Sequence, residues 1–136
     1  MNDDERRNLA VITEVCDAYN RHDVEGIVRH FAEDSSWLLS RGVPPEGGRA
    51  RGLDEIRAMA HRRFRTIPDM YWHIRSHWVS GNRGCSEWTV TGTETNGNEI
   101  NWLGCDIWEL NEDGKVVTKD TYWKFAGEEA SEQASE

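Results

Sequence analysis

The sequence predicts an α+β fold in which three N-terminal helices pack on one face of a curved antiparallel sheet. Before Pro68, apolar residues recur every three or four positions, which is typical of amphipathic helices. After Pro68 they alternate with polar residues, which is typical of strands, and turn-forming segments separate the alternating runs. With 136 residues the chain has room for one hydrophobic core, so we expect a single domain.

The first half of the chain contains the three predicted helices. Residues 3–21 carry one apolar stripe, and residues 23–31 carry a shorter stripe that begins at Asp23, a favourable N-cap residue. The third helix covers residues 54–67 and ends before Pro68, because proline interrupts a helix.

The predicted strands lie in two parts of the chain. Residues 35–40 predict a short strand, and the glycine- and proline-rich segment after it predicts an irregular loop at the rim of a pocket. Beyond Pro68, three turn-forming segments predict a four-stranded antiparallel meander. Its strands cover residues 70–80, 85–95, 99–110 and 115–125.

We expect one domain over residues 1–126, followed by an acidic tail. Residues 127–136 include four glutamates and contain no aromatic or β-branched residue. Such a segment has too little apolar surface to form a core, so we expect it to be disordered.

Composition excludes several classes of function. The net charge of −9 argues against non-specific binding to nucleic acid or to anionic membranes, and no apolar run approaches the roughly 20 residues of a membrane-spanning helix. The three cysteines follow a polar N-terminus without a signal segment, which predicts a reducing, cytoplasmic location. No cysteine or histidine group has metal-site spacing, and we expect neither a metal nor a cofactor.

The strand of residues 99–110 places one carboxyl group on an apolar face. Its even positions include Trp102, Asp106 and Trp108, and this face is expected to point to the core. In strand 115–125 the odd positions are the more apolar ones. The residues that this choice brings near Asp106 are Lys119, Thr121 and Trp123.

A second register for these two strands stays open. If a three-residue loop with a bulged Gly114 closes the turn, Asp106 lies directly opposite Asp120. Two adjacent carboxyl groups would share a proton, which raises the pKa of one of them. Because a slip of one residue turns every side chain to the other face, the register decides whether Asp106 meets Lys119 or Asp120.

All seven tryptophans fall in predicted strands, so we expect an inner sheet face lined by indole rings, with a pocket between them. In strand 70–80, tryptophans alternate with histidines. We expect Trp72 and Trp78 to face inward, and His73 and His77 to face outward or to lie at the pocket mouth.

The order of helix, short helix, short strand, glycine-rich loop, helix and four-strand meander resembles the nuclear transport factor 2-like superfamily. Within it the chain is most similar to the SnoaL-like group, named for a polyketide cyclase. The resemblance covers about residues 9–125 and implies a cone-shaped α+β barrel around a hydrophobic cavity, commonly dimeric through the outer face of the sheet. The stretches that carry it are NRHDVEGIVRHFAEDSSW, RGLDEIRAMAHRRF, SEWTVTGT and GCDIWELNEDGKVVTKDTYWKF.

Ketosteroid isomerases share the implied fold. Their strand-turn-strand aligns without gaps with residues 105–117, which places Asp106 on an oxyanion-hole aspartate that an apolar site keeps neutral. Their other catalytic residues are absent from this chain, so the resemblance does not imply ketosteroid isomerase activity. The residues at those positions are Val15 or Cys16 for the tyrosine, and Leu39 or Ser40 for the base.

Dehydratases and dehydrochlorinases of the superfamily resemble the chain at Asp23. The position of their catalytic histidine aligns near Asp69, so the Asp–His dyad is incomplete unless His73 or His77 replaces the histidine. By itself, Asp23 is expected to cap the second helix.

The function that these features predict is the binding of a small, largely apolar organic molecule, with cofactor-independent acid–base chemistry of the cyclase, isomerase or dehydratase type. Asp106 is the expected acid or oxyanion donor, and Asp120, Tyr19 and His73 are the other catalytic candidates. The alternatives are a structural ion pair between Asp106 and Lys119, a non-catalytic binding protein, and a dimerisation module. The expected ligand contacts are Trp37, Trp72, Trp88, Trp102, Trp108, Lys119, Thr121 and Trp123.

Overall fold

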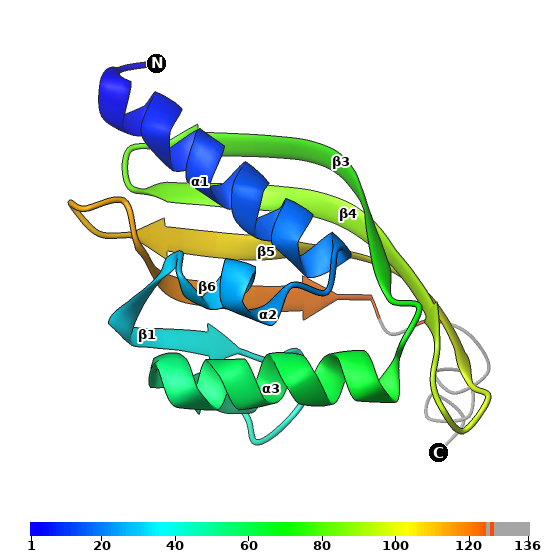
Figure 1. The fold of residues 1–136 in the computed structure, drawn as a ribbon. Helices are drawn as coiled ribbons and strands as arrows, with labels where there is room; N and C mark the ends of the chain where they lie inside the picture. Colours follow the sequence, from blue (N-terminus) through cyan, green and yellow to red (C-terminus); the bar gives the residue numbers. More distant parts are fainter. Residues whose placement is uncertain (125, 127–136) are drawn as a thin grey trace.

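The computed structural model describes residues 1–124 and 126, and it confirms the α+β fold class. Figure 1 shows the helices on one face of a twisted sheet. The predicted tail and the end of the last predicted strand, at Phe125, lie outside the described residues. The elements are α1 (Asp3–Asn20), α2 (Val24–Val28), β1 (Phe31–Leu38), β2 (Arg49–Arg51), α3 (Gly52–Thr66), β3 (Tyr71–Ser80), β4 (Arg83–Thr93), β5 (Glu99–Leu110) and β6 (Val116–Trp123).

The sheet is open and mixed, with the strand order β2-β1-β6-β5-β4-β3. β3 to β6 form the predicted antiparallel meander. The expectation of a purely antiparallel sheet is wrong at one place, because β1 pairs with β6 in parallel. Hairpin turns predict only neighbours in sequence, whereas this pairing joins β1, which precedes the meander in the chain, to β6, the last strand of the meander (Figure 1).

The short helix α2 begins as predicted and ends earlier. The side chain of Asp23 accepts a hydrogen bond from the amide of Gly26, which confirms its N-cap role. The helix stops at Val28, and Phe31 is the first residue of β1 rather than part of the helix. Phe31 is buried in either case, so its hydrophobic character alone did not distinguish the two structures.

The predicted loop after β1 contains a strand. Residues 49–51 form β2, which pairs with residues 36–38 of β1 in an antiparallel arrangement. Gly52 then has a φ of +75° at the start of α3, a conformation that glycine adopts easily. The glycine- and proline-rich segment is therefore the connection of a β-hairpin that leads directly into a helix.

A bulge in β6 fixes the register that the sequence left open. The turn is the three-residue loop, in which the amide of Asn111 donates to the carbonyl of Lys115 and Gly114 has a φ of +76°. Leu110 then pairs with Val116, but Glu109 pairs with Thr118, so Val117 is an extra residue. From Glu109 onward, counted away from the turn, the pairing between β5 and β6 is therefore shifted by one residue.

This shift brings Thr121 opposite Asp106 and Lys119 opposite Trp108. The register in which Asp106 faces Asp120 is therefore wrong, although its turn geometry is right. Near the turn, Val116 rather than the expected Val117 is buried in the core.

A second bulge lies in β3. Ile74 pairs with Trp88, whereas Ser76 pairs with Glu87, so Arg75 is the extra residue. The two-residue alternation therefore changes face in the middle of the strand.

As a consequence, Trp72 is buried as predicted, but Trp78 points outward and is 50% exposed. His77 turns inward and pairs with Ser86 of β4. The expectations of an inward Trp78 and an outward His77 are both wrong, because a strict period of two does not continue through a bulge.

Candidate functional site

Asp106, in the middle of β5, lies between three hydrogen-bond donors. Its side chain is almost fully buried. Oδ1 is 3.0 Å from Nζ of Lys119 and accepts a hydrogen bond of 2.7 Å from the hydroxyl of Thr121, while Oδ2 accepts one of 3.0 Å from Nε1 of Trp88. We call these four residues the charged cluster. β4, β5 and β6 each contribute to it, so the meander register assembles it.

The ammonium group of Lys119 is buried among aromatic rings. Nζ lies 4.6 Å, 4.9 Å and 5.8 Å from the ring centroids of Trp37, Tyr19 and Trp108, distances at which a cation interacts favourably with an aromatic face. It also donates to Thr121 Oγ1 at 2.9 Å. Burial lowers the pKa of Lys119 below its usual value, and the carboxylate of Asp106 opposes that effect.

A small void lies next to the charged cluster. Its volume is about 10 Å³, which is room for roughly one water molecule. It touches both charged groups of the cluster, and its other walls are aromatic, aliphatic and thiol side chains. The lining residues are Cys16, Tyr19, Trp72, Ile74, Trp88, Asp106 and Lys119.

Tyr19 enters this space from the last turns of α1. Its ring packs edge-on against Trp37 and Trp72, with centroid distances of 5.7 Å and 5.4 Å. The hydroxyl group is buried and has no hydrogen-bond partner among the described residues, and it therefore does not bond to Asp106. Burial, followed by the nearby Asp106, raises the pKa of Tyr19 well above its usual value. A buried hydroxyl that lacks a partner is costly, which makes this group a candidate ligand contact.

A second polar group on the inner face, which we call the serine cluster, surrounds Ser86. Its Oγ accepts a hydrogen bond of 2.9 Å from Nε1 of Trp108 and lies 2.8 Å from Nδ1 of His77. The thiol of Cys16 is 3.6 Å away. Burial lowers the pKa of His77 and raises that of Cys16 to about 12. These shifts favour the neutral forms of both groups near neutral pH.

Arg63, on α3, lies over the aromatic residues that close the inner face. Its guanidinium carbon is 5.5 Å from the ring centroids of both Trp37 and Trp123. Among the described residues it has neither an ion-pair partner within 4 Å nor a hydrogen-bond acceptor. Burial lowers the pKa of Arg63, and the electrostatic interaction with Tyr19 opposes that effect.

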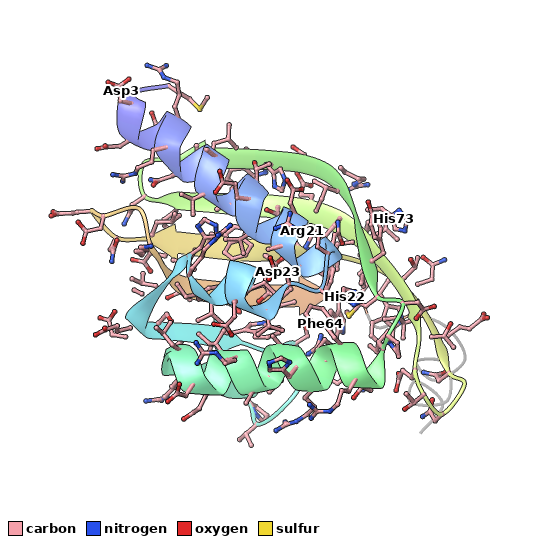
Figure 2. All side chains as sticks on the ribbon, viewed as in Figure 1. Asp3, Arg21, His22, Asp23, Phe64 and His73 are labelled. Carbon is pink, nitrogen blue, oxygen red and sulfur yellow. The ribbon has the colours of Figure 1, made fainter. Side chains whose placement is uncertain are left out.

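Two of the predicted catalytic residues do not join this arrangement. Asp120 pairs with Ile107 on the opposite face of the sheet and accepts a hydrogen bond of 3.0 Å from the hydroxyl of Tyr122. His73 is exposed and lies 3.0 Å from the hydroxyl of Thr91, and Figure 2 shows it at the bend of β3.

The resemblance to dehydratases finds no dyad at Asp23. Its carboxylate caps α2 and lies 3.6 Å from Arg21. The neighbouring His22 stacks on Phe64, with ring centroids 4.1 Å apart; both residues are labelled in Figure 2. Its Nε2 is 2.7 Å from the carbonyl of Met70. These contacts connect the end of α1 with α3 and the start of β3.

The predicted ligand-binding tryptophans occupy three positions around the charged cluster. Trp72 and Trp88 line the void, and Trp37 and Trp108 surround Lys119. Trp102 and Trp123 pack together farther along the sheet, with ring centroids 5.1 Å apart. The structure thus collects all six on the inner face, and the contacts with Lys119, Thr121 or Asp106 come from Trp37, Trp88 and Trp108.

A larger hollow of about 540 Å³ lies between the β1–β2 connection and the end of β6. Its walls include Ser40, whose hydroxyl donates to the carbonyl of Thr121 at 2.9 Å. Asp120 and Trp123 also line it. The loop predicted at a pocket rim borders this hollow. Thr121, a member of the charged cluster, also lines it.

Sequence reasoning missed three residues of the inner face. His77 was expected outside or at the pocket mouth, because the bulge at Arg75 that turns it inward is not visible in the sequence. Ser86 shares the inner face of β4 with Trp88, but its small polar side chain gave no signal of its own. Arg63 did give one. It lies three residues after Ala60 and four before Ile67, so a charged residue stands inside the apolar stripe of α3.

Neither a metal site nor a membrane-spanning helix is found in the described part of the chain. Within residues 1–124 and 126, no three His, Cys, Asp or Glu side chains are arranged to hold a metal ion. None of the helices there has the length and apolar character that crossing a bilayer requires.

Solved structures with the same fold include proteins of unknown function and polyketide-related enzymes. An NTF2-like protein of unknown function from Burkholderia pseudomallei K96243 is 26% identical, with a TM-score of 0.76 over 87% of this chain and 91% of that one. A putative SnoaL-like polyketide cyclase from Jannaschia sp. CCS1 is 12% identical, with a TM-score of 0.79 over 91% of this chain and 90% of that one.

A third structure is SalBIII, an epoxide hydrolase/cyclase-like enzyme with a role in pyran ring formation in the polyether salinomycin. It is 17% identical, with a TM-score of 0.76 over 92% of this chain and 95% of that one. Comparison with curated proteins gave no match. The family description SnoaL-like domain matches residues 12–119, most of the described chain, and includes both α1 from Ile12 onward and Lys119. The chain therefore belongs to the SnoaL-like domain family.

Proposed function

We propose that this protein binds a small, largely apolar carbonyl compound beside Asp106 and Lys119 and catalyses cofactor-independent proton transfer next to the carbonyl group. The observation that carries the proposal is a buried ion pair that faces a void together with an unpartnered hydroxyl, that of Tyr19. Cyclases, isomerases and dehydratases share this type of chemistry.

The energetics of buried charge support a functional role for the pair. Removing a carboxylate and an ammonium from water costs several kcal/mol each, and their mutual attraction often does no more than offset that cost. Apolar residues of the same size would frequently serve stability as well. The aromatic rings around the pair and the void form a chamber, whose residues are Tyr19, Trp37, Trp72, Trp88 and Trp108. A buried pair inside this aromatic chamber is therefore better explained by a chemical task than by stability alone.

The geometry assigns a role to each group. The ammonium of Lys119 is a donor that can stabilise negative charge on a carbonyl oxygen, and the hydroxyl of Tyr19 can donate to a second oxygen of the ligand. The carboxylate of Asp106 accepts from all three of its partners and can take a proton from the carbon next to that carbonyl, so we assign it the role of base in place of the acid or oxyanion donor that the sequence suggested. The electron pair of the broken C–H bond then forms the C=C bond of an enolate, and the π pair of the carbonyl group moves to the oxygen. Return of the proton to another carbon of a conjugated enolate completes an isomerisation. In a ring closure, the enolate carbon instead forms a bond to a second carbonyl carbon of the same molecule, and the oxygen of that carbonyl takes the proton from Asp106.

A ligand needs more space than the void of about 10 Å³ offers. Ligand binding therefore requires side chains to move, as rotamer changes at binding sites commonly allow. The partly buried Arg63 is the most suitable one, because its side chain is long, it lies at the edge of the aromatic chamber, and no ion pair among the described residues holds it.

Relatives of the same fold support the reaction type. The Jannaschia structure is described as a putative SnoaL-like polyketide cyclase, and SalBIII as an epoxide hydrolase/cyclase-like enzyme. Polyketides are carbonyl-rich molecules on which proton transfer next to a carbonyl leads to ring closure.

The free state of Cys16, Cys85 and Cys105 supports the cytoplasmic location that the sequence predicts.

The double variant Asp106→Asn/Lys119→Met tests the proposal. Asparagine keeps an acceptor for Trp88, and methionine keeps the length of the lysine stem, so we expect the free energy of unfolding to stay within about 2 kcal/mol of wild type. The measured activity is incorporation of deuterium at the α-carbons of 2-tetralone, followed by NMR. Wild type should accelerate it, and the double variant should not.

The matched control is Asp113→Asn/Lys124→Met, which neutralises an exposed carboxylate and an exposed ammonium. It should exchange deuterium at the wild-type rate. Binding of 2-tetralone without accelerated exchange would contradict catalysis and leave a binding function. A strongly destabilised double variant with unchanged exchange would instead show that the pair is structural.

A further inference from the structure

The chamber around the void contains more positive than negative charge. Lys119 and Arg63 are cationic, and the one carboxylate that contacts either of them within 4 Å, among the described residues, is Asp106, which pairs with Lys119. The protein as a whole has a formal charge of −9, so a surplus of positive charge here runs against the total.

The guanidinium of Arg63 has unused hydrogen-bonding capacity. Arginine has five N–H donors and no acceptor. Contacts with Trp37 and Trp123 at 5.5 Å interact with the charge but accept no conventional hydrogen bond. Asp106 does not serve this purpose: its carboxylate contacts Lys119, Thr121 and Trp88, and within the described part of the chain no ion pair within 4 Å joins it to Arg63.

The hydroxyl of Tyr19 is a second donor without a partner, and it provides independent evidence. It is buried, it belongs to a residue that lines the void, and it interacts electrostatically with Arg63. An anionic oxygen placed between the phenol and the guanidinium would accept hydrogen bonds from both. It would also balance the surplus charge.

We propose that the ligand is an aromatic or conjugated organic acid, and that Arg63 and Tyr19 bind its anionic oxygen. This inference rests on the proposed function and adds the substrate class to it. When the ligand binds, the flexible side chain of Arg63 moves out from between Trp37 and Trp123 and donates hydrogen bonds to the anion. The planar carbon skeleton then takes the space between the two indole rings, where stacking is favourable.

The test compares two probes of nearly equal size, 2-naphthoate and the neutral 2-naphthamide, by isothermal titration calorimetry. We expect wild type to bind 2-naphthoate at least about ten-fold more tightly, since hydrogen bonds to a charged group are worth that much or more. Arg63→Gln should remove the preference, and Tyr19→Phe should reduce it. Thermal melts establish that each variant is folded.

Arg62→Gln is the matched control, because Arg62 is the exposed neighbour on the same helix. It should keep the wild-type preference. Equal affinity of wild type for the two probes, or an equal effect of the Arg62 and Arg63 substitutions, would overturn the inference and leave the proposed function standing. Binding of neither probe would also overturn the inference, whereas the proposed function is decided separately by exchange in 2-tetralone. Arg63-dependent binding of 2-naphthoate, combined with no exchange in 2-tetralone, would uphold the inference and reject catalysis.

Discussion

The charged cluster and the serine cluster lie side by side on the inner face of the sheet, and Asp106 and Ser86 are paired residues of β5 and β4. Both are buried, and both include a tryptophan N–H as a donor. They differ in charge. The serine cluster consists of groups that stay neutral, whereas the charged cluster holds an ion pair next to a void.

This difference indicates different tasks. In the serine cluster, the single oxygen of Ser86 meets Trp108, His77 and Cys16, so these neutral groups satisfy one another. Such an arrangement holds α1, β3, β4 and β5 together. The charged cluster instead has an unpartnered hydroxyl beside it and an arginine with free donors above it. A complete neutral network is typical of structure, and an incomplete charged one is typical of a binding site.

Among the substitutions that test this difference between the clusters, Lys119→Met alone should have the largest effect on the free energy of unfolding. The substitution leaves the Asp106 carboxylate buried without its cation, which should cost about 3–5 kcal/mol in the free energy of unfolding. Urea denaturation measures it. The exposed control Lys124→Met should change stability by less than about 0.5 kcal/mol. A loss as small as the control's would mean that the pair is not an ion pair in solution.

A smaller effect is expected from Ser86→Ala in the serine cluster. The indole N–H of Trp108, a fully buried residue, loses its acceptor, and such a loss costs about 1–3 kcal/mol. Denaturation with urea again gives the value, with the exposed Ser80→Ala as control. Deuterium exchange in 2-tetralone should remain, because Ser86 does not line the void. Loss of exchange without loss of stability would make the serine cluster part of the site.

The smallest effect is expected on the stability of the serine cluster at alkaline pH, through the thiol of Cys16. The pKa of the Cys16 thiol rises from 9.0 to about 12 on folding, mainly through burial. The unfolded chain therefore releases this proton first, so stability is complete below pH 9 and falls as the pH rises toward 12. Between pH 7 and pH 10, wild type should lose roughly 1.4 kcal/mol more than Cys16→Ala. Equal losses in the two proteins would mean that the thiol ionises freely in the fold.

Much of the fold follows from local patterns in the sequence. The apolar stripe of α1, the cap at Asp23 and the alternation in β5 each depend only on residues that are close in the chain, and the structure confirms them. The proximity of Asp106 to Lys119 and Thr121 was also expected, because the even face of β5 is apolar over its whole length.

The sequence determined that an acid, a lysine and several tryptophans lie on neighbouring strands, because alternation and turn residues are local. Tertiary structure decided which of these side chains meet. The bulge at Val117 turns Lys119 rather than Asp120 toward Asp106, and the bulge at Arg75 exchanges Trp78 for His77 on the inner face. A bulge is stabilised by pairing with the neighbouring strand and by the core beneath it, and neither is present in the order of residues along one strand.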